Sequence, residues 1–251
     1  MTEPGISPVE APGLSQWARV INIFAAPSKT FTDIKNRNKS WWVPLIILIV
    51  TGAFMWGSVY KQVTWKTVYD NQQRNAPEFA KRMQEQQPPE VRAASEKAGP
   101  ISQAVTWAIS PLGLLGINAL AALVLWPTIN FGFGGKATFG SVFAVTMWAM
   151  LVLWPLKLIL GGIALWAGAT PEAFDLNNIA GTNYGYYMET HTGPLYVLAV
   201  SLDPIVIWNL AVTGIGISIV AGVKRSSGYI AVFGWWALWI LVFLGFSAAF
   251  S

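Results

Sequence analysis

The chain has 251 residues, of which 54% are hydrophobic and 11% charged, with 16 Lys and Arg against 12 Asp and Glu. A soluble domain carries about 25% charged residues, so this composition excludes an ordinary soluble protein. The sequence has no Cys and one His, which excludes disulfides, thiolate metal sites and His-cluster metal sites. The sequence therefore predicts an integral membrane protein that holds neither a metal nor a cofactor.

The first 40 residues divide into two parts. Residues 1–13 are rich in Pro, Gly and Glu, and we expect a disordered tail. Residues 14–40 form an amphipathic segment with apolar side chains at helical spacing. The apolar face consists of Leu14, Trp17, Ile21 and Phe24, and the outward polar face of Ser15, Gln16, Arg19 and Asn22.

This apolar stripe is followed by a set of cations, a pattern that favours a helix lying in the headgroup layer of an anionic leaflet. The residues expected at the lipid interface are Trp17, Phe24, Lys29, Lys35, Arg37 and Lys39. The alternative is that the stripe packs against the protein's own spans.

Residues 41–251 form the expected membrane domain, with five apolar stretches long enough to cross about 30 Å of hydrocarbon as helices. Backbone groups in lipid must be satisfied within the span, and nothing here resembles the alternating strands of a barrel. We therefore expect an all-α, five-helix transmembrane bundle with an N-terminal amphipathic interfacial helix. The predicted spans are residues 41–60, 104–131, 139–167, 195–223 and 228–250.

The connections between spans predict the orientation of the chain. Lys136 and the pair Lys224-Arg225 lie in two connections on one side, whereas residues 168–194 on the other side contain no Lys or Arg. The positive-inside rule then places the N-terminus in the cytoplasm and the C-terminus outside. The polar external loop 61–103 opposes this assignment, because it contains seven Lys and Arg. We expect it to form a helical hairpin from residues 76–87 and 90–98.

Catalytic motifs are missing from the sequence, and His191 is expected to be a surface residue without a ligand partner. The ionisable residues well inside the spans are Lys157 and Asp203, at similar depth on consecutive antiparallel helices. Three interpretations of these two residues are left open. They form a structural ion pair, they act separately as a snorkelling lysine and a capping aspartate, or they build a substrate or proton site. Small residues within the spans would let helices approach closely, and two asparagines could form hydrogen bonds across the bundle. The small residues are Gly113, Gly116, Gly214, Gly216 and Ser218, and the asparagines are Asn118 and Asn209.

Residues at both ends of the membrane domain resemble those of bacterial Yip1-domain proteins. The start carries Arg19, Phe24, Pro27, Phe31, Ile34, Trp41 and Pro44, and the end carries Asp203, Trp208, Leu210, Gly214, Lys224-Arg225 and Gly-Trp-Trp-Ala-Leu-Trp over 234–239. The resemblance implies five spans in a bacterial cytoplasmic membrane with a cytosolic N-terminus. Eukaryotic members act in vesicle trafficking with Rab GTPases. This chain lacks their Asp-Leu-Tyr-Gly-Pro motif, so that role is not carried over.

We therefore expect a non-enzymatic Yip1-type protein that organises or scaffolds the membrane through helix and lipid contacts. Its expected partners are anionic membrane lipids and not nucleic acid, and a second copy or another membrane protein is left open. The alternative is a small transporter or channel subunit with a polar site near Lys157 and Asp203. A transporter needs a hydrated route from the Lys157 level to both surfaces, whereas a scaffold does not.

Overall fold

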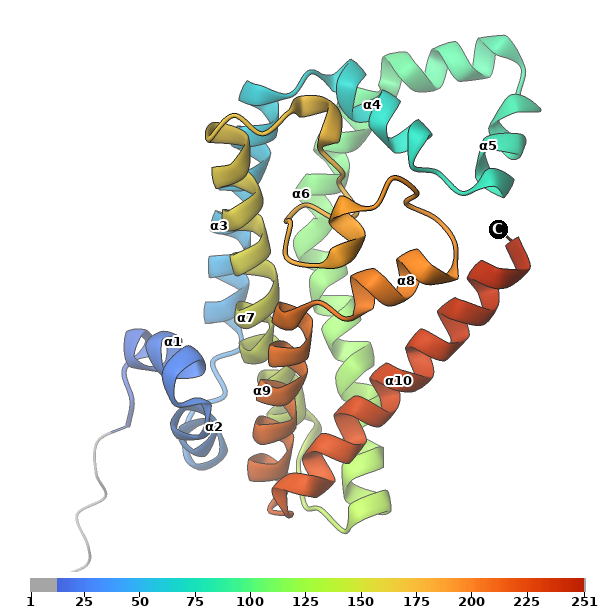
Figure 1. Cartoon of the computed structure of the whole chain (residues 1–251). Coiled ribbons are helices and arrows are strands. Elements are labelled where there is room, and N and C mark those ends of the chain that lie inside the picture. The colour runs from blue at the N-terminus through green and yellow to red at the C-terminus, as the bar shows by residue number, and fades with distance from the viewer. Residues whose placement is uncertain (1–12, 251) are drawn as a thin grey trace, which may run out of the picture.

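The computed structural model describes residues 13–250, so the expected tail over residues 1–13 lies outside the described part except for Gly13. The described residues are mostly helical and contain no strand. Five helical segments are long and apolar enough to cross a membrane, which confirms the predicted all-α fold with five spans (Figure 1). They are α3 (Trp42–Gln62), α6 (Pro89–Pro127) continued by the π-helix η1 (Thr128–Gly132), α7 (Phe139–Trp166), α9 (Pro204–Ala221) and α10 (Arg225–Phe250).

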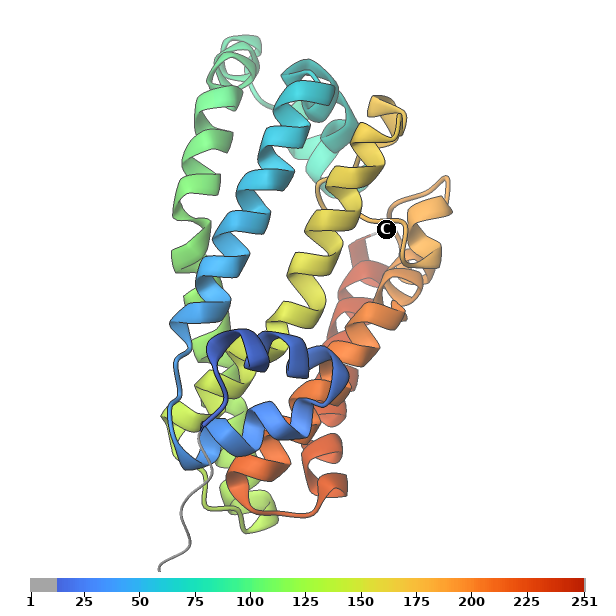
Figure 2. The same ribbon diagram turned by 90° about the vertical axis from the view of Figure 1, so that its left-hand side faces the viewer.

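Helix α7 is the centre of the bundle. It contacts α3, α6 and α9, and it also contacts the two short N-terminal helices, α1 (Gln16–Ala25) and α2 (Pro27–Asn36). Figure 2 shows α3, α6 and α7 side by side, with α1 and α2 lying across the lower part of the bundle. Helix α10 packs mainly on α9 and slants away from α6, as Figure 1 shows.

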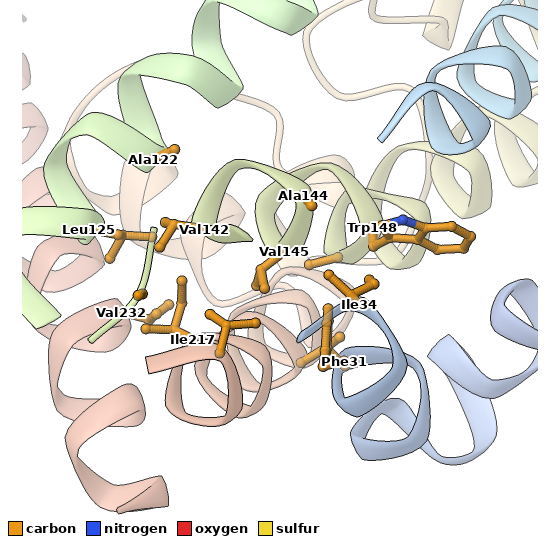
Figure 3. Packing of buried hydrophobic residues seen from close by; sticks show 14 of the residues in the cluster. Phe31, Ile34, Ala122, Leu125, Val142, Ala144, Val145, Trp148, Ile217 and Val232 are labelled. Carbon is orange, nitrogen blue, oxygen red and sulfur yellow. The ribbon is translucent and has the colours of Figure 1, made fainter. Parts of the chain in front are cut away.

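The main core lies where α7, α9 and α2 meet. Phe31 and Ile34 of α2 are fully buried there beside Val145 of α7 and Ile217 of α9 (Figure 3). Gly216 permits this approach, because a Cβ at that position would lie 2.5 Å from Val145 Cγ1. The α1–α2 segment is therefore part of the folded bundle and not an appendage.

The small residues expected to pack divide into two groups. Gly214, Gly216 and Ser218 are buried, and a Cβ at Gly214 would lie 2.6 Å from the ring of Tyr229 in α10. By contrast, Gly113 and Gly116 of α6 face open space, so the prediction that they pack against a helix is wrong.

The predicted fourth span, residues 195–223, is interrupted in the structure. It consists of a short helix α8 (Pro194–Ser201) and the spanning helix α9, separated by Leu202 and Asp203. Pro204 has no N–H and restricts the backbone of the residue before it, so a continuous helix is disfavoured at this point. Asp203 then caps α9 by accepting a hydrogen bond from Ile205 N at 2.8 Å.

The polar segment 61–103 also differs from the expected hairpin. It contains α4 (Trp65–Arg74), which the sequence did not predict, and α5 (Glu78–Glu85). The expected second arm, residues 90–98, is not a separate helix, because α6 starts at Pro89 and continues into the second span. Figure 1 shows these elements at the upper end of the bundle, opposite the α6–α7 and α9–α10 connections.

Candidate functional site

The N-terminal helices form a compact pair whose ends the sequence defines. Ser15 caps α1 by accepting a hydrogen bond from Ala18 N at 3.1 Å, and Pro27 begins α2 at a position where a missing N–H costs nothing. Ala26 joins the two helices. The chain therefore reverses within one residue and brings α2 back under α1.

Arg19 was expected on the outward polar face, and the structure contradicts this. Its side chain is buried, with Nη2 2.5 Å and Nε 2.7 Å from Oδ2 of Asp33 in α2. Nη1 also donates to the carbonyl oxygen of Asn38 at 2.8 Å. A planar guanidinium bridging a carboxylate and a carbonyl satisfies most of its donors, which is what makes a buried arginine tolerable. The sequence pattern missed this because the partner lies 14 residues away.

Because Arg19 points into the bundle, the residues of the apolar stripe lie in two different environments. Trp17 and Ile21 are 76% and 66% exposed and point away from the bundle. Phe24 instead packs edge to face on Trp208 of α9, with ring centroids 5.9 Å apart. The expected lipid-interface residue Phe24 therefore helps to hold α1 on the bundle, whereas Trp17 presents its ring to the surroundings.

The cations expected at the interface are all exposed, and they meet cations from two distant connections. Lys39 Nζ donates to Thr138 Oγ1 in the α6–α7 connection at 3.3 Å, and Arg225 Nη2 donates to Ser28 Oγ in α2 at 2.8 Å. One end of the molecule thus carries seven exposed cations. They are Lys29, Lys35, Arg37, Lys39, Lys136, Lys224 and Arg225. We call this set the basic end.

A second polar site lies in the opposite half of the bundle. The structure brings Lys157 of α7 and Asp203 together, with Nζ 2.7 Å from Oδ2. Asp203 is fully buried and also accepts hydrogen bonds from Thr182 Oγ1 at 2.6 Å and Asn183 Nδ2 at 3.2 Å. The carboxylate therefore has partners on both oxygens, as a buried charge requires.

The segment between α7 and α9 supplies these partners by folding back along α7. Asn183 exchanges two side-chain hydrogen bonds with Asn178, at 2.8 and 3.1 Å. The carbonyl oxygen of Ile179 comes so close to α7 that a Cβ at Gly161 would lie 2.4 Å from it. Lys157 lies nine residues before the end of α7, which places the ion pair about 14 Å below that end.

His191, which the sequence predicted to be a surface residue, is partly buried. Its Nδ1 lies 3.2 Å from Asp175 Oδ2, and its ring stacks on Tyr196 with centroids 5.3 Å apart. Burial, followed by the charge of Asp175, raises the pKa of Tyr196 to about 12. Asp175 also accepts from Asn75 Nδ2 at 2.9 Å, so this cluster ties the segment over residues 61–103 to the segment between α7 and α9.

Residues that the sequence gave no reason to select also join these segments. Asn71 of α4 donates to the carbonyl oxygens of Pro171 and Phe174, both at 2.9 Å. Arg74 donates to the carbonyl oxygen of Glu172. These bonds reach across about 100 residues, and nothing in the local pattern marks them. Between residues 13 and 250, no three His, Cys, Asp or Glu residues lie together as metal ligands would.

The region below the ion pair is closed by apolar side chains. The fully or almost fully buried apolar residues on this side include Val145, Trp148, Leu151, Val152 and Ile217, and the buried polar residues Thr146, Thr213 and Ser218 lie on the same helices. Hollows among the described residues include four of about 10 to 410 Å³, and neither Lys157 nor Asp203 lines any of these four. The polar site thus faces an apolar layer in the direction of the basic end.

The fold and these two sites define a multi-pass helical membrane protein with an N-terminal helix pair docked on its bundle. Comparison with known families assigns it more closely, since the family model for the Yip1 domain matches residues 21–247. The chain belongs to the Yip1 domain family. No curated protein and no solved structure matches it.

Proposed function

We propose that the protein is a non-enzymatic membrane organiser that binds anionic lipid through its basic end at the cytoplasmic leaflet of a bacterial inner membrane. In this orientation the N-terminus is cytoplasmic and the C-terminus external. The exposed ring of Trp17 lies in the headgroup layer, where amphipathic rings are favoured. The external side carries the α4–α5 segment and the residues that follow α7.

The observation that carries this proposal is the separation of charge between the two ends. The one described acid of the basic end, Asp33, is buried against Arg19 and also lies 3.8 Å from Arg37 Nε, so the described residues of this end expose seven cations and no carboxylate. At the other end, residues 61–103 have seven cations and five acids, and residues 168–193 add three acids. Each cation near an anionic leaflet contributes about 1 kcal/mol, so the orientation with the basic end at that leaflet is favoured.

Organisation of the membrane further requires contacts with neighbours, and two spans leave room for them. Only a small share of α6 and α10 is buried within the described residues, so both helices offer apolar faces to lipid or to another membrane protein. The transporter alternative has less support, because the apolar layer below Lys157 opposes a hydrated route to both surfaces.

The test is lipid selection by the full chain. The protein is extracted in polymer discs from vesicles of phosphatidylethanolamine with a minority of phosphatidylglycerol, and the lipids in the discs are counted by mass spectrometry. We expect enrichment of phosphatidylglycerol that is lost when Lys29, Lys35, Arg37 and Lys39 are changed to Gln. The matched control changes four exposed cations of the opposite end, Lys61, Arg82, Arg92 and Lys97, to Gln. Equal enrichment in wild type and both variants would contradict the proposal.

A further inference from the structure

Three segments that are distant in the sequence meet at one corner of the basic end. Lys136 N, in the α6–α7 connection, donates to the carbonyl oxygen of Ala221 at 3.0 Å. Lys35 of α2 reaches the same place, since its Nζ would lie 3.6 Å from a Cβ on Gly222. Lys224 follows two residues later. The corner therefore gathers cations from residues 35, 136 and 224 without a carboxylate between them.

Arg225 is the fourth cation of this corner. Its guanidinium donates from Nη2 to Ser28 Oγ at 2.8 Å, which holds the start of α10 against α2. A guanidinium has five donors, so most of them remain free for an anion after this bond. The side chains of Lys35, Lys136, Lys224 and Arg225 are all exposed. Their charges are thus available to a ligand from outside the protein.

The backbone at the corner keeps these cations close together. Gly222 ends α9 with a φ of 71°, in the left-handed region that favours glycine, and this turns the chain sharply into Lys224 and Arg225. Gly135 lies so close to α9 that a Cβ there would be 2.9 Å from Ala221 Cβ. The α6–α7 connection and the α9–α10 turn are therefore packed against each other by small residues, and the backbone positions that carry their cations are fixed relative to each other.

Four like charges held at one corner repel one another, and the described structure offers them no acid. Asp33, the described acid of this end, is buried and engaged by Arg19 and by Arg37, neither of which belongs to the four. One phosphodiester would neutralise a single cation of the four. A headgroup with at least two phosphate charges would compensate more of them and would accept charge-assisted hydrogen bonds from several donors.

We propose that this corner, formed by Lys35, Lys136, Lys224 and Arg225, is a discrete binding site for a membrane lipid whose headgroup carries two phosphate charges. The inference rests on the proposed function, because it gives a defined site to the anionic lipid that the basic end attracts. It goes further in requiring saturable binding of one lipid at a particular place. Diffuse attraction would depend only on the number of cations removed.

The experiment is native mass spectrometry of the full chain in neutral detergent. It is titrated separately with diphosphatidylglycerol, phosphatidylglycerol and inorganic phosphate. We expect one saturable diphosphatidylglycerol per chain, bound more tightly than phosphatidylglycerol. Lys35→Gln should weaken it about fivefold, and Lys35→Gln with Lys224→Gln roughly thirtyfold, if each cation contributes as it does at a membrane surface. The control Lys29→Gln removes an exposed lysine of the same helix. Lys29 lines a hollow with Ser28, Thr32, Asp33, Asn36 and Arg37 and with none of the four corner cations, so the change should weaken binding less than about twofold.

The outcomes separate this site from general attraction. Equal losses in Lys35→Gln and Lys29→Gln would overturn the site and leave the proposed function intact. Comparable occupancy by inorganic phosphate would assign the corner to a soluble anion and overturn the lipid. A wild-type chain without any preference for anionic lipid would overturn both proposals. If Lys35→Gln with Lys224→Gln fails to fold, Lys35→Arg with Lys224→Arg keeps both charges and must retain binding.

Discussion

Lys157 Nζ lies 2.7 Å from Asp203 Oδ2, about 14 Å from the C-terminal end of α7, and the two partners differ in their remaining contacts. Asp203 keeps donors from Thr182, Asn183 and the backbone of Ile205 if the lysine is removed. Lys157 is 12% exposed, and the carboxylate is its closest charge. The pair is therefore asymmetric, and its two single mutants are not equivalent.

We predict that Lys157→Met and Asp203→Asn each lower thermal stability in detergent, because breaking a buried pair typically costs about 3–5 kcal/mol. Asp203→Asn should lower the stability more than Lys157→Met, because it leaves the lysine without its carboxylate partner and also weakens the cap of α9. The double mutant should recover much of the loss. Melting temperatures of the four proteins complete the cycle, and additive losses would show that the two residues act independently.

The buried Arg19–Asp33 pair should hold α1 and α2 in place. Arg19→Met removes the close guanidinium partner of buried Asp33 and leaves Arg37 at 3.8 Å, and we expect a loss of about 3–5 kcal/mol and earlier cleavage of the N-terminal segment by protease. The control is Trp17→Ala, whose side chain is exposed and should leave melting in detergent nearly unchanged. Unchanged protease resistance in Arg19→Met would show that other contacts suffice to hold the helix pair.

Gly161 should be needed for the segment between α7 and α9 to fold back into the bundle. A Cβ at this position meets the carbonyl oxygen of Ile179, which is backbone and cannot turn away. We expect Gly161→Ala to destabilise by about 1–3 kcal/mol, as overpacking does. Gly113→Ala is the matched control, because it faces open space within a helix and should stabilise by up to about 1 kcal/mol. Equal melting temperatures for both variants would contradict the close approach.

The orientation of the chain is testable because the sequence has no Cys. A cysteine at Gln87, in the segment between α5 and α6, should react with an impermeant thiol reagent in intact spheroplasts. One at Ser226, beside the basic end, should react only after the membrane is opened. The reverse pattern would place the N-terminus outside and overturn the proposed leaflet.

The sequence allowed the five spans to be predicted because twenty-residue apolar runs are unambiguous. It also placed Lys157 and Asp203 at one depth, since the geometry of two consecutive helices follows from residue counts. It could not show which way α1 faces, because Arg19 looks polar until Asp33 provides a buried partner. The break before α9 lies within an apolar run, and the sequence offered the capping role of Asp203 as an alternative to the ion pair, whereas the structure gives Asp203 both roles. Long-range polar contacts such as those of Asn71 left no trace in the pattern.

The proposed function depends most on α1 lying in the headgroup layer with its exposed apolar face toward lipid. The direct measurement is the depth of a spin label attached at Ile21→Cys in the reconstituted full chain, compared with Thr32→Cys on α2. Both positions are exposed, and the chain has no other thiol. If α1 lies there, oxygen should enhance the relaxation of the label at position 21, and a water-soluble nickel complex should not. The label at position 32 should respond to nickel and not to oxygen. Equal access of nickel to both labels would contradict this position of α1.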